Sequence, residues 1–301
     1  MIPKQFIGSE AQTTYEQAEV VILPIPYERT TTYRQGCQDG PEAIITASDQ
    51  LEAYDIELER EICHSQGIYT TEAIADTRLI PDLIPEVMLE QVTNKVSELI
   101  HDGKFTIALG GEHSITAAVV KAYQQALDRS FTVVQIDAHG DLRHSYEGSI
   151  YNHACVMRRI LDLGLPTLGI GIRSICLEEA QLIKQQKIPV IWAREIAGDS
   201  NWIDRAIAKI ATEKVFITID LDGLDPSLMP GVGTPEPGGL NWYELTKFLR
   251  AVFTKHQVIG CDVMELAPTS DSVVSEFTAA KLVYKLVGYS KLNGNISVKN
   301  N

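Results

Sequence analysis

Cysteine is scarce in this 301-residue chain, and none of its five cysteines forms a CxxC pair. They are scattered and odd in number: Cys37, Cys63, Cys155, Cys176 and Cys261. A disulfide framework needs an even set at regular spacings, so we expect reduced thiols, as in a cytoplasmic protein.

Long apolar runs are also missing. No uninterrupted apolar stretch approaches the roughly 20 residues that a transmembrane helix needs. The segment 1–10 has no basic stretch followed by an apolar core, so it does not resemble a signal peptide. We therefore expect a cytoplasmic protein with no membrane partner.

Basic residues are few relative to acidic ones. The chain has 26 Lys and Arg against 40 Asp and Glu, a formal net charge of −14 at pH 7. Nucleic-acid binding needs a basic face, so this balance argues against a nucleic-acid partner. A small cationic partner would meet a favourable field. No linker, low-complexity tract or internal repeat divides the chain, so we expect residues 1–301 to form a single domain.

Short apolar runs alternate with amphipathic segments along the chain. Continuous apolar strands alternating with helices indicate a buried parallel sheet covered on both faces, which is an α/β fold. The expected strands are 20–25, 105–109, 131–136, 167–172, 189–192, 215–219 and 258–263, and the expected helices include 86–101, 114–127, 177–186, 201–212 and 241–255.

The most informative motif, Asp137-Ala-His-Gly-Asp141, directly follows the apolar run 131–136. Asp137, His139 and Asp141 recur with period two, and in a strand this spacing places side chains on one face. Two carboxylates and an imidazole would converge on one point, which is costly to bury without a cation. The motif predicts a metal site where this strand ends.

Similar side chains follow three other apolar runs. Gly-Gly-Glu-His113-Ser, Asp220-Leu-Asp222 and Met-Glu265 each come directly after a predicted strand. Open parallel sheets bind ligands in the crevice outside the carboxyl ends of their strands. We therefore expect these side chains to lie beside the first motif.

The predicted cluster balances charge if it holds two divalent cations. Its four aspartates carry about four negative charges when ionised, and two histidines complete the shells. Mixed imidazole and carboxylate ligation suits manganese, iron, nickel, cobalt or zinc better than thiolate-seeking metals. Two such ions would lower the pKa of a shared water, which predicts a hydrolase. The six candidate ligands are His113, Asp137, His139, Asp141, Asp220 and Asp222.

Each pattern alone also fits an ordinary structural role. The Asp-x-His-x-Asp motif fits surface turns and caps. His113 fits a polar helix start after a glycine turn, and Asp222 with Asp225 fits a turn before Pro226. Three separate patterns after three apolar strands favour a common metal site.

In this order, the motifs resemble the three metal signatures of the ureohydrolases, the arginase and agmatinase family. They are Gly110-Gly-Glu-His-Ser114, Asp137-Ala-His-Gly-Asp141 and Ile219-Asp-Leu-Asp-Gly-Leu-Asp-Pro226, and the loop 228–240 is similar as well. The resemblance runs from about residue 20 to the carboxyl terminus. It implies an arginase-like three-layer α/β/α sandwich around a mostly parallel sheet, usually holding two Mn²⁺ ions.

The resemblance also implies how the ligands are divided. Asp137 and Asp220 would bridge the ions, and hydroxide attack on a guanidinium carbon would release urea and an amine. One ion would be held by His113, Asp137, Asp141 and Asp220, and the other by His139, Asp137, Asp220 and Asp222.

Two further residues match family positions that act on the substrate. Glu265 matches the carboxylate that holds the planar guanidinium in a fork. His153, in Tyr-Asn-His153-Ala-Cys, matches the histidine that shuttles a proton to the leaving amine. Taken alone, His153 also fits a hydrogen-bonded polar residue and Glu265 an ordinary strand-end charge. We expect His64, His101, His144 and His256 to be surface or local polar residues.

Agmatine is the substrate that the sequence favours, with putrescine and urea as products. Arginases bind the α-amino group with an aspartate after a Gly-Leu-Arg segment, and this chain has Ser174 there, in Gly171-Ile-Arg-Ser174. Arg143 complicates the choice, because it would repel a distal ammonium but could hold a carboxylate. An ion pair with Glu147 or another acidic residue is the structural alternative for Arg143, although Glu147 could also bind an extra amine.

Other substrates and classes stay open at this point. N1-aminopropylagmatine, 4-guanidinobutyrate, guanidine and arginine are alternatives for the same chemistry. A binuclear metallophosphoesterase also uses Asp-x-His, but its later Gly-Asn-His-Asp/Glu element is absent here. A non-catalytic metal-binding member is a further alternative. The resemblance implies a homotrimer or homohexamer, whereas spacing does not choose manganese over nickel or cobalt. The role of the amino-terminal arm with Thr30 to Tyr33 also stays open.

Overall fold

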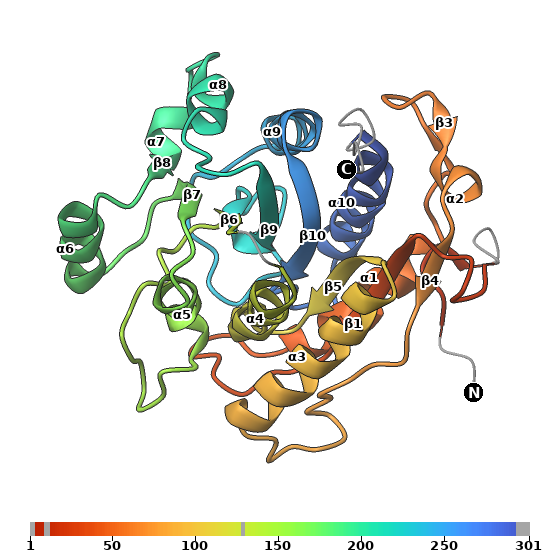
Figure 1. The fold of residues 1–301 in the computed structure, drawn as a ribbon, viewed down its shortest axis with the longest axis horizontal. Helices are drawn as coiled ribbons and strands as arrows, with labels where there is room; N and C mark the ends of the chain where they lie inside the picture. The colour runs from red at the N-terminus through yellow and green to blue at the C-terminus, as the bar shows by residue number, and fades with distance from the viewer. Residues whose placement is uncertain (1–3, 9–12, 128–129, 293–301) are drawn as a thin grey trace.

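The computed structural model describes residues 4–8, 13–127 and 130–292. Its centre is an eight-stranded sheet with the order β4-β1-β5-β10-β9-β6-β7-β8 (Figure 1), in which neighbouring strands run parallel. The strands are β1 (Val20–Ile25), β4 (Ile68–Thr70), β5 (Phe105–Gly110), β6 (Thr132–Ile136), β7 (Thr167–Ile172), β8 (Val190–Trp192), β9 (Lys214–Asp220) and β10 (Gln257–Met264). A short antiparallel pair, β2 (Tyr54–Asp55) and β3 (Arg60–Glu61), lies outside this sheet.

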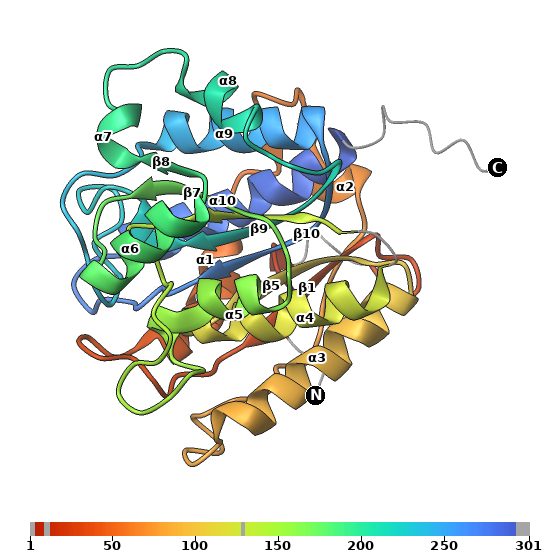
Figure 2. The ribbon, with the colours of Figure 1, turned by 60° about the vertical axis from the view of Figure 1, so that its left-hand side comes forward.

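Helices cover both faces of the sheet and form two hydrophobic cores. One core packs the sheet against α1 (Gly40–Ser48), α8 (Trp202–Ile207), α9 (Trp242–Lys255) and α10 (Val274–Ser290). The other packs it against α3 (Pro85–His101), α4 (Thr116–Ala126) and α5 (Val156–Asp162). Figure 2 shows α9 and α10 on one side of the sheet and α3, α4 and α5 on the other. The remaining α-helices of the described residues are α2 (Ile62–Ser65), α6 (Leu177–Gln186) and α7 (Ala193–Ile196).

Strand β1 illustrates why the apolar runs are continuous. Val20 and Ile22 pack into the first core, whereas Val21 and Leu23 pack into the second. Alternate side chains of a strand point to opposite faces, so a strand buried on both faces must be apolar throughout. The predicted three-layer α/β/α fold around a parallel sheet is therefore confirmed.

Three details differ from the sequence predictions. The predicted helix 201–212 is too long, because α8 ends at Ile207. The hydroxyl of Thr212 instead bonds the carbonyl of Lys214 at 2.7 Å and the hydroxyl of Thr132 at 2.8 Å. These bonds favour the extended backbone that leads into β9. The predicted helix 114–127 begins as a 3₁₀ turn, η3 (His113–Ile115), before α4. The three-residue edge strand β4 was not predicted.

All five cysteines are free thiols, as the sequence predicts. Among the described residues, no helix combines the length and apolar character required to cross a bilayer.

Candidate metal centre

The predicted site residues lie at the carboxyl ends of four neighbouring strands, β5, β10, β9 and β6. His113 opens η3 after β5, Asp137 follows β6, Asp220 ends β9, and Glu265 follows β10. Because adjacent parallel strands end at the same edge of a sheet, these side chains converge there.

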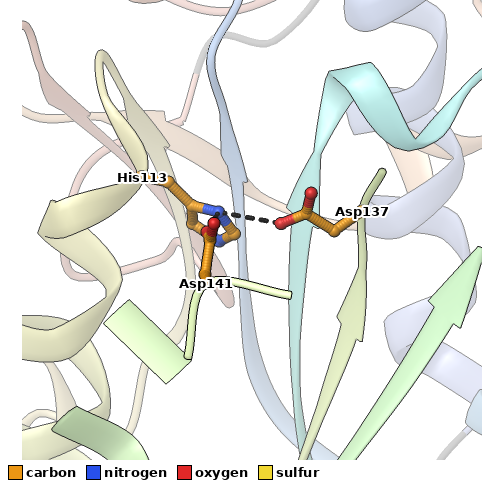
Figure 3. Close-up of side chains that lie close together, drawn as sticks. All are labelled: His113, Asp137 and Asp141. Carbon is orange, nitrogen blue, oxygen red and sulfur yellow. Dashed lines mark ion pairs between the residues drawn. The ribbon is translucent and has the colours of Figure 1, made fainter. Parts of the chain in front are cut away.

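The imidazole of His113 faces three carboxylates. Its Nδ1 lies 3.2 Å from Oδ2 of Asp137, 3.1 Å from Oδ2 of Asp141 and 3.3 Å from Oδ2 of Asp220. Figure 3 shows the imidazole with the first two of these carboxylates, and the dashed line marks the ion pair between His113 and Asp137. The other ring nitrogen, Nε2, is 2.8 Å from the hydroxyl of Thr218, which orients the ring.

The Nδ1 atom of His113 is buried and has no hydrogen-bond partner among the described residues. Buried polar atoms are normally paired, so an orphaned nitrogen among carboxylate oxygens needs an explanation. A divalent cation, bound by one imidazole nitrogen and several carboxylate oxygens, would satisfy all of these atoms. The residues therefore fit a metal ion.

A second group lies next to the first. Nδ1 of His139 is 2.9 Å from Oδ2 of Asp222 and 3.7 Å from Oδ1 of Asp137. Asp137 thus approaches the two imidazoles with different oxygens, and it belongs to both possible metal-binding groups. The structure brings all six candidate ligands together, while their role as ligands stays a prediction.

The ionisation of this cluster depends on burial and mutual repulsion. Burial and the charge of Asp137 raise the pKa of Asp141 to about 7, and burial together with neighbouring carboxylates also raises the pKa of Asp220 and Asp222. Burial opposes ionisation of Asp137, but the adjacent imidazoles of His113 and His139 outweigh burial and lower its pKa. Four neighbouring buried carboxylates need positive charge to ionise together, which two divalent cations would supply.

The backbone at the centre is unusual at two positions. Asp141 has φ 52° and Glu265 has φ 68°, in the left-handed region that residues other than glycine rarely adopt. Such conformations cost on the order of 1 kcal/mol each and cluster at functional sites. The surrounding structure therefore holds Asp141 and Glu265 in place although their backbone conformation is locally unfavourable.

A cavity of about 260 Å³ opens beside the centre, and both predicted substrate residues line it. Glu265 uses Oε1 to accept the backbone N–H of His113 at 2.7 Å. Nδ1 of His153 lies 3.8 Å from the same oxygen. Burial and the two nearby imidazoles lower the pKa of His153 to about 4.

The cavity also has walls that the sequence did not single out. Loop residues supply them, and loop positions depend on contacts far along the chain rather than on a local pattern. The only sequence signal was proximity to the motifs. The additional lining residues include Tyr146, Cys176 and Thr234. Thr32, in the arm whose role the sequence left open, also lines the cavity, as do Ser174 and Arg143, which correspond to substrate-binding positions of arginases.

Arg143 does not make the expected ion pair. None of the ion pairs between described residues joins Arg143 to Glu147; instead its guanidinium lies 4.5 Å from the ring centre of Tyr146. The reason is a tight turn, in which Tyr146 and Ser149 exchange backbone hydrogen bonds around Glu147 (φ 46°) and Gly148 (φ 83°). This turn leaves Glu147 exposed and sets Tyr146 under the arginine.

The remaining histidines lie outside the cluster, as predicted. His64, His101 and His144 are exposed. His256 is half-buried and bonds the carbonyl of Thr212 through Nδ1 at 3.1 Å.

Comparison with known proteins gives consistent matches over most of the chain. Residues 18–288 match the Arginase family. An N(1)-aminopropylagmatine ureohydrolase of Synechocystis sp. is 61% identical over 287 residues, covering 95% of this chain and 94% of that protein. An agmatinase of Pyrococcus horikoshii is 35% identical, covering 91% of this chain and 93% of that protein. The crystal structure of agmatine ureohydrolase of Thermoplasma volcanium superposes with a TM-score of 0.84 at 32% identity, covering 99% and 98% of the two chains.

Proposed function

Because this chain belongs to the arginase family, it is a ureohydrolase acting on guanidino compounds, and we propose that its substrate is N1-aminopropylagmatine. The observation that carries the choice of substrate is the 61% identity to the Synechocystis protein of that name. The sequence favoured agmatine and held the longer compound as an alternative. The family assignment excludes the metallophosphoesterase alternative. The identity to proteins named as ureohydrolases supports an enzyme over a non-catalytic member of the family.

The metal centre is the first part of the proposal. We infer that His113, Asp137, Asp141 and Asp220 hold one divalent cation and that His139, Asp137, Asp220 and Asp222 hold a second, most simply Mn²⁺. The orphaned Nδ1 of His113 and the shared position of Asp137 support this division. When bound, two such ions supply Lewis acidity that makes water nucleophilic near neutral pH.

Glu265 holds and orients the guanidinium in this proposal. Its Oε1 is occupied by the N–H of His113, so Oε2 is the oxygen left to bind a guanidinium N–H. A charge-assisted hydrogen bond to a planar cation fixes both its position and its plane. The carbon of the guanidinium is thereby presented to the nucleophile from a fixed direction.

His153 handles the proton of the leaving amine. Its imidazole is 17% exposed, so it touches both the cavity and water. The low pKa keeps the ring neutral at pH 7, so it can accept a proton at one nitrogen and deliver it to the amine as the carbon–nitrogen bond breaks. Urea and the corresponding triamine are the products.

The charge of the protein suits a polyamine substrate. N1-aminopropylagmatine carries two ammonium groups besides its guanidinium, and the chain has a net charge of −14. Stacking on Tyr146 holds the Arg143 guanidinium at the cavity wall, and Ser174 offers no charge for the α-amino group of arginine. Agmatine is the second candidate, supported by the 35% identical Pyrococcus agmatinase.

A urea-release assay tests the proposal. The Mn²⁺-loaded protein is assayed with N1-aminopropylagmatine, agmatine, 4-guanidinobutyrate, guanidine and arginine. We expect kcat/KM to be highest for N1-aminopropylagmatine, lower for agmatine and lowest for arginine. A higher value for agmatine would select the second candidate, and equal or greater activity on arginine would overturn both.

A further inference from the structure

Glu112 is a buried carboxylate next to His113 that the proposed chemistry does not use. It has no exposed surface, and among the ion pairs of the described residues none involves it. Its side chain accepts hydrogen bonds from the backbone N–H groups of Arg29 and Thr30, each at 2.5 Å, and from the hydroxyl of Thr30 at 2.7 Å. The hydroxyl of Ser114 donates a further bond.

These donors come mainly from the amino-terminal arm, about 80 residues earlier in the chain. Burying a carboxylate is costly unless several hydrogen bonds compensate, and the backbone and hydroxyl donors of the arm supply most of that compensation. Glu112 therefore fixes the position of the arm, and the contacts of Thr30 extend beyond Glu112.

Thr30 passes the connection on to His153. Its hydroxyl donates to Glu112 and also accepts the backbone N–H of His153 at 2.9 Å. Its carbonyl accepts the side-chain amide of Asn152 at 3.4 Å. Two residues later, the hydroxyl of Thr32 lies 3.5 Å from Nε2 of His153. The arm therefore fixes both the main chain and one face of the imidazole.

We propose that Glu112 is a positioning residue, which sets His153 beside Glu265 through the hydroxyl of Thr30. The inference rests on the proposed function, in which His153 handles the proton of the leaving amine. The adjacent residues Glu112 and His113 then position two different parts of the site. Its Glu112 side chain holds the arm and His153, and the N–H of His113 holds Glu265.

Geometry explains why this connection affects turnover. Proton transfer requires the donor and acceptor within hydrogen-bond reach, about 2.6–3.2 Å in the reacting complex. Displacement of a positioned group by about 1 Å can reduce a rate by about 100-fold. Loss of the Thr30 hydroxyl would free the N–H of His153 and let the ring move relative to the leaving amine. Substrate binding through Glu265 would be little affected.

The experiment compares Thr30→Val, which keeps the shape of the side chain without its hydroxyl, with Thr30→Ser, which keeps the hydroxyl. Glu112→Gln weakens the same connection at its other end. Thr31→Val is the matched control, because the Thr31 hydroxyl bonds Glu28 at 3.0 Å rather than His153. Urea release, bound metal per chain and the melting temperature are measured for each variant of the full chain.

We expect Thr30→Val and Glu112→Gln to lower kcat by about 10- to 100-fold, with KM within about threefold of the wild-type value and metal content retained. Thr30→Ser should restore kcat, and Thr31→Val should match the wild type. The variant that combines Thr30→Val and Glu112→Gln should have about the same kcat as the slower of the two single variants, because both changes break the same chain of hydrogen bonds. Wild-type kcat in Thr30→Val, or an equal loss in Thr31→Val, would overturn the proposal.

A second readout does not depend on activity. In the metal-free protein, hydrogen–deuterium exchange of the segment 150–156 should be faster in Thr30→Val and Glu112→Gln than in Thr31→Val, since the amide of His153 loses its acceptor. An unchanged exchange rate in this segment would contradict the hydrogen-bonded connection from Glu112 through Thr30 to His153. Absence of urea release by the wild-type enzyme with every guanidino compound would instead contradict the proposed function, while the exchange result would still stand.

Discussion

The backbone N–H of His113 donates a 2.7 Å hydrogen bond to Oε1 of Glu265. The residue that faces three carboxylates is thereby joined directly to the residue proposed to hold the guanidinium. The separation between the two parts of the site is thus set by a main-chain atom, which moves less than a side chain. The same bond leaves one carboxylate oxygen of Glu265 for the substrate.

Glu265→Gln tests the charge of that oxygen. The amide oxygen can still accept the N–H of His113, so the local structure should persist. A hydrogen bond with a charged partner contributes about 1.5–3 kcal/mol, so we expect kcat/KM for urea release to fall by about 10- to 100-fold. Metal analysis should give the wild-type content, and Glu90→Gln, at an exposed position of α3, should behave as the wild type. Undiminished kcat/KM would rule out Glu265 as the guanidinium carboxylate.

Gly233→Ala tests the space beside the same oxygen. A Cβ at this glycine would lie 3.8 Å from Oε2 of Glu265 and 3.2 Å from the carbonyl of Arg34. The methyl group would crowd a guanidinium there while shifting the arm only slightly, so we expect KM to rise several-fold with a nearly unchanged melting temperature. Steady-state kinetics and calorimetry check this. An unchanged KM would mean that the guanidinium does not approach Oε2 from the side of Gly233.

Asp137→Asn and Asp141→Asn distinguish a shared ligand from an unshared one. Asp137 contacts both imidazoles, whereas Asp141 contacts His113. We expect Asp141→Asn to lose one of the two proposed ions and Asp137→Asn to lose both, with urea release reduced by more than about 100-fold in each. Metal content after gel filtration is the measurement. Asp225→Asn, whose side chain bonds Ser227, is the control; equal metal content in the first two variants would contradict sharing by Asp137.

Lys285→Met tests a charge cluster far from the site. Lys285 in α10 contacts Asp55 at 2.8 Å and Glu57 at 2.7 Å, and the lysine and Asp55 are almost fully buried. Leaving a buried carboxylate unpaired typically costs about 3–5 kcal/mol, so the free energy of unfolding at pH 7 should fall by that order. Lys95→Met, which breaks an exposed pair with Glu98, should cost at most about 1 kcal/mol.

The loss in Lys285→Met should depend on pH in one direction. Burial opposes ionisation of Asp55 and Glu57, but bonds with Lys285 outweigh it and lower the pKa of both. Carboxylates with lowered pKa stabilise the fold above their unfolded values, about 3.9 for Asp and 4.3 for Glu, and this contribution is lost as the pH falls below them. Urea unfolding from pH 7 to pH 3 should therefore show the wild type and the variant converging below about pH 4. A constant difference would contradict this account.

The sequence brought the candidate metal-binding residues together correctly because each group directly follows the end of a strand. Asp137, His139 and Asp141 lie after β6 rather than within it, and Asp141 has φ 52°, so the expected period-two strand does not continue through the motif. The parallel neighbours of β6 carry the other candidate ligands at the same edge. Both the fold class and this meeting point depend only on the apolar runs and on the polar residues directly after each run. Position relative to a strand end is thus sufficient to place these side chains.

The pocket walls could not be predicted in the same way. Glu112 reaches His153 through Thr30, which lies more than 80 residues before both of them in the chain, and no local pattern encodes such a contact. Arg143 has two potential partners nearby, Tyr146 and Glu147. A turn with two residues in the left-handed conformation places the ring of Tyr146, rather than the carboxylate of Glu147, against the guanidinium. The length of α8 was overestimated because the helical pattern of the sequence continues past Ile207, where the helix ends. Five residues later, the hydroxyl of Thr212 bonds the carbonyl of Lys214 at the start of β9.

Strand β6 is held in register by a parallel neighbour on each side, with Ile136 opposite Ile170 of β7 and Ile219 of β9. Deleting one residue inside β6 would turn every later side chain of the strand to the other face, and deleting two would draw the ligands back by about 7 Å. Changes of chain length are therefore tolerated only beyond the strand ends. The loop 142–152 comes after the last candidate ligand of the motif and before His153. Insertions there could reshape the pocket for guanidino compounds of other lengths without disturbing the candidate ligands.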